Sequence, residues 1–160
     1  MKHLYEYNWQ VRDEWFELLQ NISQEELNKP RVGGLKSFSE TLFHIIVVEY
    51  YWMSGLLSQS AGRFQSTDYR SLGELIKLSK DLHPTVNEFI SKWSIEKESD
   101  IFEAHGPSGK IERFTYGEVM RHVLIHEIHH IGQLSIWAHE LDLEPVTANF
   151  IRRGIISNSD

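Results

Sequence analysis

Hydrophobic residues recur at intervals of three and four positions in four long segments of the chain, with polar residues between them. This spacing is typical of amphipathic helices that bury one face. The segments cover about residues 4–19, 37–57, 71–93 and 115–141. The second segment is apolar on nearly all sides, as expected for a helix in the middle of a bundle. The pattern therefore predicts an all-α fold, a four-helix bundle.

Capping residues mark where these helices begin. A Ser or Thr followed three positions later by Glu forms a capping box, in which each of the two side chains bonds a free backbone amide. Ser37, Ser71 and Thr115 start such boxes before the last three helices, and Ser23 starts another before a single short turn. The Pro and two Gly within residues 30–34 then break the chain.

The third helix and its connection to the fourth are less regular. Pro84 falls inside the third helix, and we expect it to kink or divide that helix because proline lacks the amide donor. Between residues 96 and 114, a Gly-Pro-Ser-Gly turn separates two short mixed segments, which predicts a small hairpin or an extended loop. This long connection also allows a crossover between helices.

The composition limits the classes of function. The chain has 160 residues, 41% of them hydrophobic, which is enough for the core of one domain over residues 1–160. The net charge is −7 and no run of Lys and Arg occurs, so we expect no binding to nucleic acid. No segment is apolar enough to cross a membrane, and the N-terminus lacks the apolar core of a signal peptide. We therefore expect a cytoplasmic protein.

Histidine is the most informative residue type. Four of the nine histidines cluster on the predicted fourth helix: His122, His126, His129 and His130. Cys is absent, so a transition-metal site would have to use imidazole and carboxylate ligands. His44 is the only histidine of the apolar second helix, where its nitrogens need a polar partner. One divalent metal ion shared by the two helices would provide that partner, since bundle sites take ligands from facing helices.

Two histidine pairs on the fourth helix compete for this role. His126 and His130 lie roughly 40° apart around the helix and one turn apart along it, which is the geometry of H-x-x-x-H zinc ligands. His122 and His126 share the same spacing, so spacing alone does not choose between the pairs. An interpretation without a metal also remains, a core His44 bonded to a backbone carbonyl. For His122 and His129 we favour a contact beside the metal ligands or in a groove over coordination of the ion.

Both histidine segments resemble a known family. Residues 115–134, TYGEVMRHVLIHEIHHIGQL, are similar to the fourth-helix signature of the DinB/YfiT-like superfamily, and His44 followed by Glu49 and Trp52 resembles its other motif. The number of helices and the chain length are similar too. The resemblance implies an up-down-down-up four-helix bundle that holds one divalent metal, usually zinc or nickel, and that is often a homodimer.

Carried over position by position, the resemblance assigns the metal ligands to His44, His126 and His130. It thereby selects the histidine pair that spacing left open. One departure from the family pattern is Ile131, because many members have Arg after the double histidine. The ligand positions themselves are unaffected by this departure.

Three neutral imidazoles would leave a divalent metal ion with its full +2 charge and at least one open coordination position. Such an ion lowers the pKa of bound water and deprotonates a bound thiol. Family members include enzymes that use low-molecular-weight thiols and metal-dependent hydrolases, so the resemblance implies a metalloenzyme that activates a thiol or water against a small-molecule electrophile. The candidates for helping residues lie near the ligands in sequence: Glu49, Tyr51, His122, His129 and Gln133.

Two other functions stay open. The metal motif contains no evident nucleophile or acid–base pair, which favours a metal-binding stress-response protein without catalysis. The aromatic residues Trp9, Tyr51, Trp52 and Trp137 could instead line a groove for a small molecule, although such a stripe is ordinarily core. In either case, apolar surface on the first and fourth helices predicts a homodimer.

Overall fold

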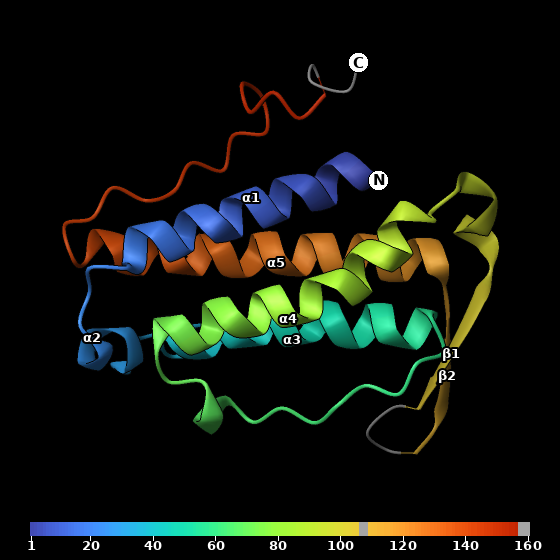
Figure 1. The fold of residues 1–160 in the computed structure, drawn as a ribbon, viewed down its shortest axis with the longest axis horizontal. Coiled ribbons are helices and arrows are strands. Elements are labelled where there is room, and N and C mark those ends of the chain that lie inside the picture. Colours follow the sequence, from blue (N-terminus) through green and yellow to red (C-terminus); the bar gives the residue numbers. More distant parts are fainter. Residues whose placement is uncertain (106–108, 157–160) are drawn as a thin grey trace.

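Four long helices lie side by side and form the body of the molecule (Figure 1). The structure is a computed structural model that describes residues 1–105 and 109–156. Its elements are, in chain order, α1 (Lys2–Leu19), α2 (Gln24–Asn28), α3 (Phe38–Leu56), the 3-10 helix η1 (Ser66–Asp68), α4 (Leu72–Ser91), the 3-10 helix η2 (Ile95–Ser99), β1 (Ile101–His105), β2 (Ile111–Thr115) and α5 (Tyr116–His139). The prediction of a mostly helical chain is confirmed, with a small two-stranded sheet in addition.

The long helices contact one another in a ring. Both α1 and α3 pack against α4 and α5. Among the helices in the described part of the chain, none combines the length and the apolarity needed to cross a bilayer. The up-down-down-up order of the helices, which the family resemblance implies, stays a prediction.

The capping residues predicted from the sequence begin the helices. Ser71 and Thr115 form complete capping boxes with Glu74 and Glu118, so both hydrogen bonds of each box are present. Ser37 accepts a hydrogen bond from a backbone amide in the first turn of α3. These bonds satisfy amides that a helix leaves free at its start, which explains why α3, α4 and α5 begin where they do.

Pro84 lies inside α4, which is continuous from Leu72 to Ser91. Of the two expected effects of Pro84, a kink or a division, the division is therefore wrong. Buried side chains on both sides of the proline hold the two halves in one helix: Leu75, Leu78, Val86, Phe89 and Ile90. Burying one such side chain contributes roughly 1.5–3 kcal/mol. Several of them together outweigh the cost of a proline in a helix, which is about 3 kcal/mol.

The core consists of two clusters of buried side chains. Trp15, Phe38 and Trp137 belong to the first cluster, and Tyr5 and Met120 belong to the second. The Tyr5 hydroxyl donates a hydrogen bond to the Met120 carbonyl at 2.9 Å, which joins α1 to α5. Each cluster contains residues from all four long helices. Packing therefore holds α3 and α5, the two helices that carry the candidate ligands, at two places along their length.

A β-hairpin closes one end of the bundle (Figure 1). Its strands β1 and β2 are antiparallel, with Ile101 opposite Thr115, so the hairpin alternative of the prediction is confirmed. The predicted turn falls mainly on residues 106–108, which lie outside the described residues. Phe102 of β1 covers Gly55 near the end of α3, where a Cβ atom would lie 2.9 Å from the Phe102 ring. The absence of a side chain at Gly55 lets the hairpin approach α3 closely.

Candidate metal centre

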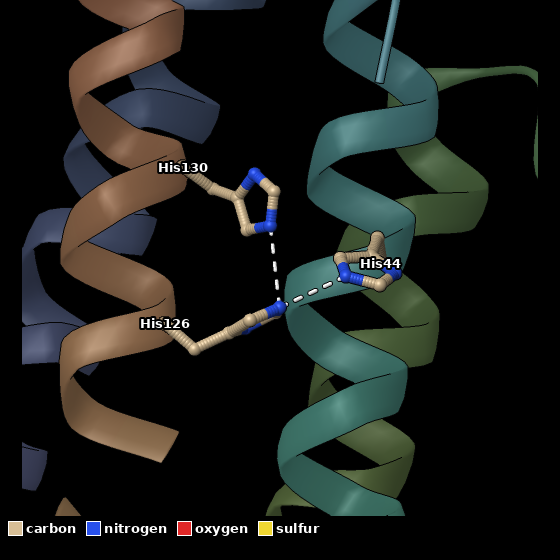
Figure 2. Close-up of side chains that lie close together, drawn as sticks. All are labelled: His44, His126 and His130. Carbon is tan, nitrogen blue, oxygen red and sulfur yellow. Dashed lines mark hydrogen bonds between the residues drawn. The ribbon is translucent and has the colours of Figure 1, made fainter. Parts of the chain in front are cut away.

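Three histidines from two helices converge between α3 and α5 (Figure 2). His44 projects from α3, and His126 and His130 project from α5, one turn apart. The Nε2 atom of His126 lies 2.9 Å from Nε2 of His44 and 3.2 Å from Nε2 of His130. One ring nitrogen from each histidine lies within 4.8 Å of those from the other two. We call these residues the histidine trio.

The nitrogen spacing of the histidine trio fits a small divalent ion. A tetrahedral ion with ligand nitrogens at about 2.0–2.1 Å separates those nitrogens by roughly 3.3 Å. The two close Nε2 contacts, 2.9 and 3.2 Å, are near this value. Three imidazoles without a thiolate suit zinc, nickel, copper and iron alike. The histidine trio could therefore hold one metal ion.

The protonation state of the histidine trio also favours a metal. Burial lowers the pKa of His44, and the neighbouring His130 lowers it further. Burial, followed by the nearby His130 and His44, lowers the pKa of His126 to about 4. Both imidazoles are therefore neutral at pH 7, which is the form that binds a metal ion. His130 is buried, whereas His44 and His126 are half-buried, so the trio is reachable from outside.

Gln133 orients the innermost histidine. Its Oε1 lies 2.8 Å from Nδ1 of His130, so it accepts the proton of that nitrogen. This tautomer leaves the Nε2 lone pair of His130 facing the other two histidines. A hydrogen bond to the second nitrogen is the usual way in which proteins fix a metal-binding imidazole. The Gln133 amide in turn donates to Nε2 of His129 at 3.1 Å.

The loop before α3 covers Gln133. A Cβ atom at Gly34 would lie 2.5 Å from Oε1 of Gln133 and 3.3 Å from the Trp137 ring. The backbone of Gly34 also has a φ of 50°, in the left-handed region that favours glycine. The indole of Trp137 donates to the Val32 carbonyl at 3.1 Å, which holds the loop on α5. The loop therefore restrains the residue that orients His130.

This geometry distinguishes between the two histidine pairs that compete on α5. His122 is exposed and lies outside the group of three close nitrogens, whereas His130 belongs to it. The His122 ring lies 5.7 Å from the His126 ring and 5.6 Å from the Trp52 ring, measured between centroids. His129 is exposed on the other flank and contacts Gln133. Both residues lie beside the histidine trio without belonging to it.

Glu49 and Tyr51, the two candidate helping residues on α3, make their hydrogen bonds away from the histidine trio. Glu49 is buried and accepts hydrogen bonds from Trp9 Nε1 at 2.9 Å and Arg12 at 2.8 Å. It lies five positions after the α3 histidine, roughly 140° around the helix, and so faces α1. The Tyr51 hydroxyl accepts a hydrogen bond from the amide of Phe64 at 3.3 Å. Neither contact involves the histidine trio, so the structure lends no support to a chemical role for these two residues.

A buried ionic network beside the site was not predicted. Arg12 of α1 bonds Glu49 of α3 at 2.8 Å and Glu127 of α5 at 2.7 Å. Asn8 donates to the same carboxylate of Glu127 at 3.2 Å. Burial, opposed by Arg12, raises the pKa of Glu127 to about 7. One guanidinium thus connects the two helices that carry the histidine trio.

A signal for this network existed in the sequence. The polar residues Asn8 and Arg12 lie on the same buried stripe of α1 as the aromatic residues Tyr5 and Trp15. Glu127 likewise shares a stripe of α5 with Val123 and Leu134. A buried charge needs a partner of opposite charge. Matching a cation on one stripe to an anion on another would therefore have suggested the pair.

The four aromatic residues proposed to line one groove belong to different parts of the core. Trp137 is buried in the first core cluster. Trp9 and Trp52 pack against the second cluster, and Tyr51 is exposed. Because these side chains are divided between two clusters, the structure gives no support to a single groove formed by all four.

Three imidazoles from two helices of one bundle define the class of this protein, a helical protein with a candidate histidine metal site. The model of the DinB family matches residues 1–154, and the chain belongs to the DinB family. Ile131, the departure noted from the family resemblance, is buried in the first core cluster.

The chain is also similar to two other proteins. It is 39% identical over 153 residues to the protein YizA of Bacillus subtilis (strain 168), which covers 96% of this chain and 95% of that protein. A crystal structure of a DinB-like protein from Bacillus cereus ATCC 10987 has a TM-score of 0.66 at 16% identity, and covers 88% of this chain and 93% of that one. At this identity, the structural likeness supports the fold alone.

Proposed function

We propose that this protein is a metalloenzyme that holds one divalent ion on His44, His126 and His130. The observation that carries the proposal is the convergence of their ring nitrogens, with Nε2 of His126 at 2.9 and 3.2 Å from the other two. The bound ion would activate a low-molecular-weight thiol or a water for attack on a small electrophile. Half-burial of His44 and His126 supports this role, because it leaves room for a substrate beside the ligands.

The surrounding residues support the chemistry in distinct ways. Gln133 keeps the proton of His130 on Nδ1 and so keeps Nε2 free as a ligand. Arg12 and its two carboxylates hold α3 and α5 at a fixed distance. His122 is exposed one turn from His126, with 5.7 Å between the ring centroids, so it lies beside the proposed reacting group. Zinc and nickel are the ions we propose.

A second candidate function is metal binding without catalysis. It is favoured by one observation, that the two buried carboxylates of the described residues, Glu49 and Glu127, both pair with Arg12. Neither is therefore available as a general base. Turnover distinguishes this candidate from the enzyme.

Metal analysis of the purified protein tests the ligand assignment. We expect one equivalent of zinc or nickel in the wild type and in His139→Ala, a control that alters an exposed histidine of the same helix. We expect its loss in His44→Ala and His130→Ala. Stoichiometric metal in both of these variants would overturn the site. The loaded protein is then mixed with bacillithiol or glutathione and a chlorobimane, and metal-dependent consumption of the thiol would support catalysis over simple binding.

We propose further that the protein is a homodimer with α5 in the contact. Ile125, Ile128 and Ile136 lie on one face of α5 and are 66%, 47% and 64% exposed. Gly132, also exposed, lies between them and adds no side chain. A second copy that presents the same face would cover these isoleucines, since a two-fold contact pairs identical surfaces.

We also propose the up-down-down-up order for the four long helices. The connection over residues 57–71 supports this order, because in Figure 1 it runs along the bundle between the end of α3 and the start of α4. Such a long crossover is what two neighbouring parallel helices require.

A further inference from the structure

A cavity of about 260 Å³ lies between α3, β2 and the beginning of α5. Its lining consists of Trp52 of α3, Phe114 of β2, and Glu118, Val119 and His122 of α5. The walls are therefore mainly aromatic and aliphatic. Trp52 contacts Phe114 edge-on, with 5.9 Å between ring centroids, so the hairpin supports the aromatic wall.

The cavity and the histidine trio are neighbours along α5. His122 lines the cavity, and its ring centroid lies 5.7 Å from that of His126. Val119, on the cavity wall, precedes His126 by seven residues, or roughly 10 Å along the helix. One imidazole therefore separates the candidate metal centre from an apolar cavity.

The size and charge of the cavity indicate what it would accept. An apolar cavity of roughly 150 Å³ is large enough for benzene, so 260 Å³ can hold a single ring with a substituent. The carboxylate of Glu118 is held at the lining by the amide and hydroxyl of Thr115. Its negative charge would repel an anionic group, so a neutral aromatic ring fits best.

We propose that this cavity is a specificity pocket that binds a neutral aromatic ring of the substrate while the substrate's reactive polar group lies at the histidine trio. This inference rests on the proposed function, because it takes the metal-binding histidines as the reacting end. It assigns Trp52 and Phe114 to recognition of the ring. His122 lies between the two ends, beside the chain that links them.

The proposal is tested with hydroxamates, which bind a metal through their oxygens. Zinc-loaded protein is titrated by calorimetry with acetohydroxamate and with three compounds that carry a phenyl ring on one, two or three methylenes. We expect the best phenyl compound to bind at least about tenfold more tightly than acetohydroxamate, because a ring buries a large apolar area. The longer linkers should bind best, since the ring must reach from His126 toward Val119.

Two variants locate the ring. Phe114→Ala removes one wall and Val119→Phe fills the cavity, and each should reduce the phenyl advantage to threefold or less while acetohydroxamate binds as before. The matched control is Phe64→Ala, which alters a half-buried Phe outside the cavity lining. Circular dichroism and retained zinc verify that each variant is folded.

The outcomes separate this inference from the proposed function. Equal binding of acetohydroxamate and all phenyl compounds would overturn the pocket and leave the metal site intact. A phenyl advantage that persists in both Phe114→Ala and Val119→Phe would overturn it too. If no hydroxamate binds the zinc-loaded protein, the ion has no open coordination position. That result would overturn both the proposed function and the pocket.

Discussion

The Nδ1 atom of His130 lies 2.8 Å from Oε1 of Gln133, and this contact determines which nitrogen of His130 faces His126 and His44. Gln133 has no place in the histidine trio itself. Its effect on metal binding would pass through the tautomer and the ring orientation of His130. This distinction makes Gln133 a positioning residue.

Gln133→Ala should weaken zinc binding by roughly 10- to 100-fold, because loss of such an orienting hydrogen bond has effects of that size. Gln133→Glu should retain most of the affinity, since a carboxylate also accepts the Nδ1 proton. Competition with a chromophoric chelator measures both. Equal affinity of the wild type and Gln133→Ala would show that the contact does not matter for the metal.

Gly34→Ala, in the loop before α3, should disturb the contact between Gln133 and His130. Its Cβ would lie 2.5 Å from Oε1 of Gln133, so the amide must move away from His130. Gly33→Ala is the matched control, because Gly33 also has positive φ (81°) but its Cβ would meet nothing within 4 Å. We expect Gly34→Ala to lower zinc affinity more than Gly33→Ala, and similar affinities would refute the clash.

Arg12→Met should destabilise the protein strongly. It leaves the buried carboxylates of Glu49 and Glu127 without their cation, and breaking a buried ion pair in this way costs about 3–5 kcal/mol. Lys77→Met is the control, since the pair of Lys77 with Asp81 is exposed to solvent and should contribute little to the free energy of unfolding. Urea unfolding monitored by circular dichroism compares the two. A cost for Arg12→Met no larger than the control's would contradict the network's role.

The metal-free protein should lose stability on acidification through His126. The fold lowers the pKa of His126 to about 4, below the value of about 6.5 for an unperturbed imidazole. The folded state thus favours the neutral ring, and this contribution is complete above about pH 6.5. It is lost as the pH falls from about 6.5 to about 4, because the unfolded chain takes up the proton first.

Urea midpoints of the metal-free protein measured across this pH range test the expectation. His126→Phe should flatten the decline between pH 6.5 and 4, whereas His139→Phe, at an exposed histidine of the same helix, should leave it unchanged. An identical decline in wild type and His126→Phe would assign the acid sensitivity to other groups.

Ile125→Glu combined with Ile136→Glu should convert the proposed homodimer into a monomer. Two charges on the exposed face of α5 would have to be desolvated in a two-fold contact. Ile95→Glu, at a 69% exposed isoleucine of η2, is the control and should not change the mass. Light scattering after gel filtration measures the assembly, and a wild-type monomer would refute the dimer directly.

Local signals predicted much of the fold and the candidate site. Ser71 and Thr115 begin helices where their capping boxes lie, because capping depends on residues only three positions apart. The spacing of His126 and His130 is likewise a property of one helix. The choice of His130 over His122 needed the family resemblance, because spacing treats both pairs alike.

Relationships between distant segments could not be predicted from these patterns. The Arg12 network joins residues more than a hundred positions apart, and only the packed bundle brings them together. Gly55 is a glycine because Phe102 occupies its side-chain space, which no local pattern reveals. Packing on both sides of Pro84 outweighs the local cost of proline and keeps α4 undivided, which no local pattern reveals.

The ion pairs of Arg12 with Glu49 and Glu127 have a consequence for engineering this chain. The first helix donates no nitrogen to the histidine trio, yet it sets the separation of the two helices that do. Exchanges on α1 that never touch the histidine trio would therefore change the spacing of its imidazoles, and a fragment beginning after Arg12 would keep all three imidazoles but lose the ion pairs that join α3 and α5.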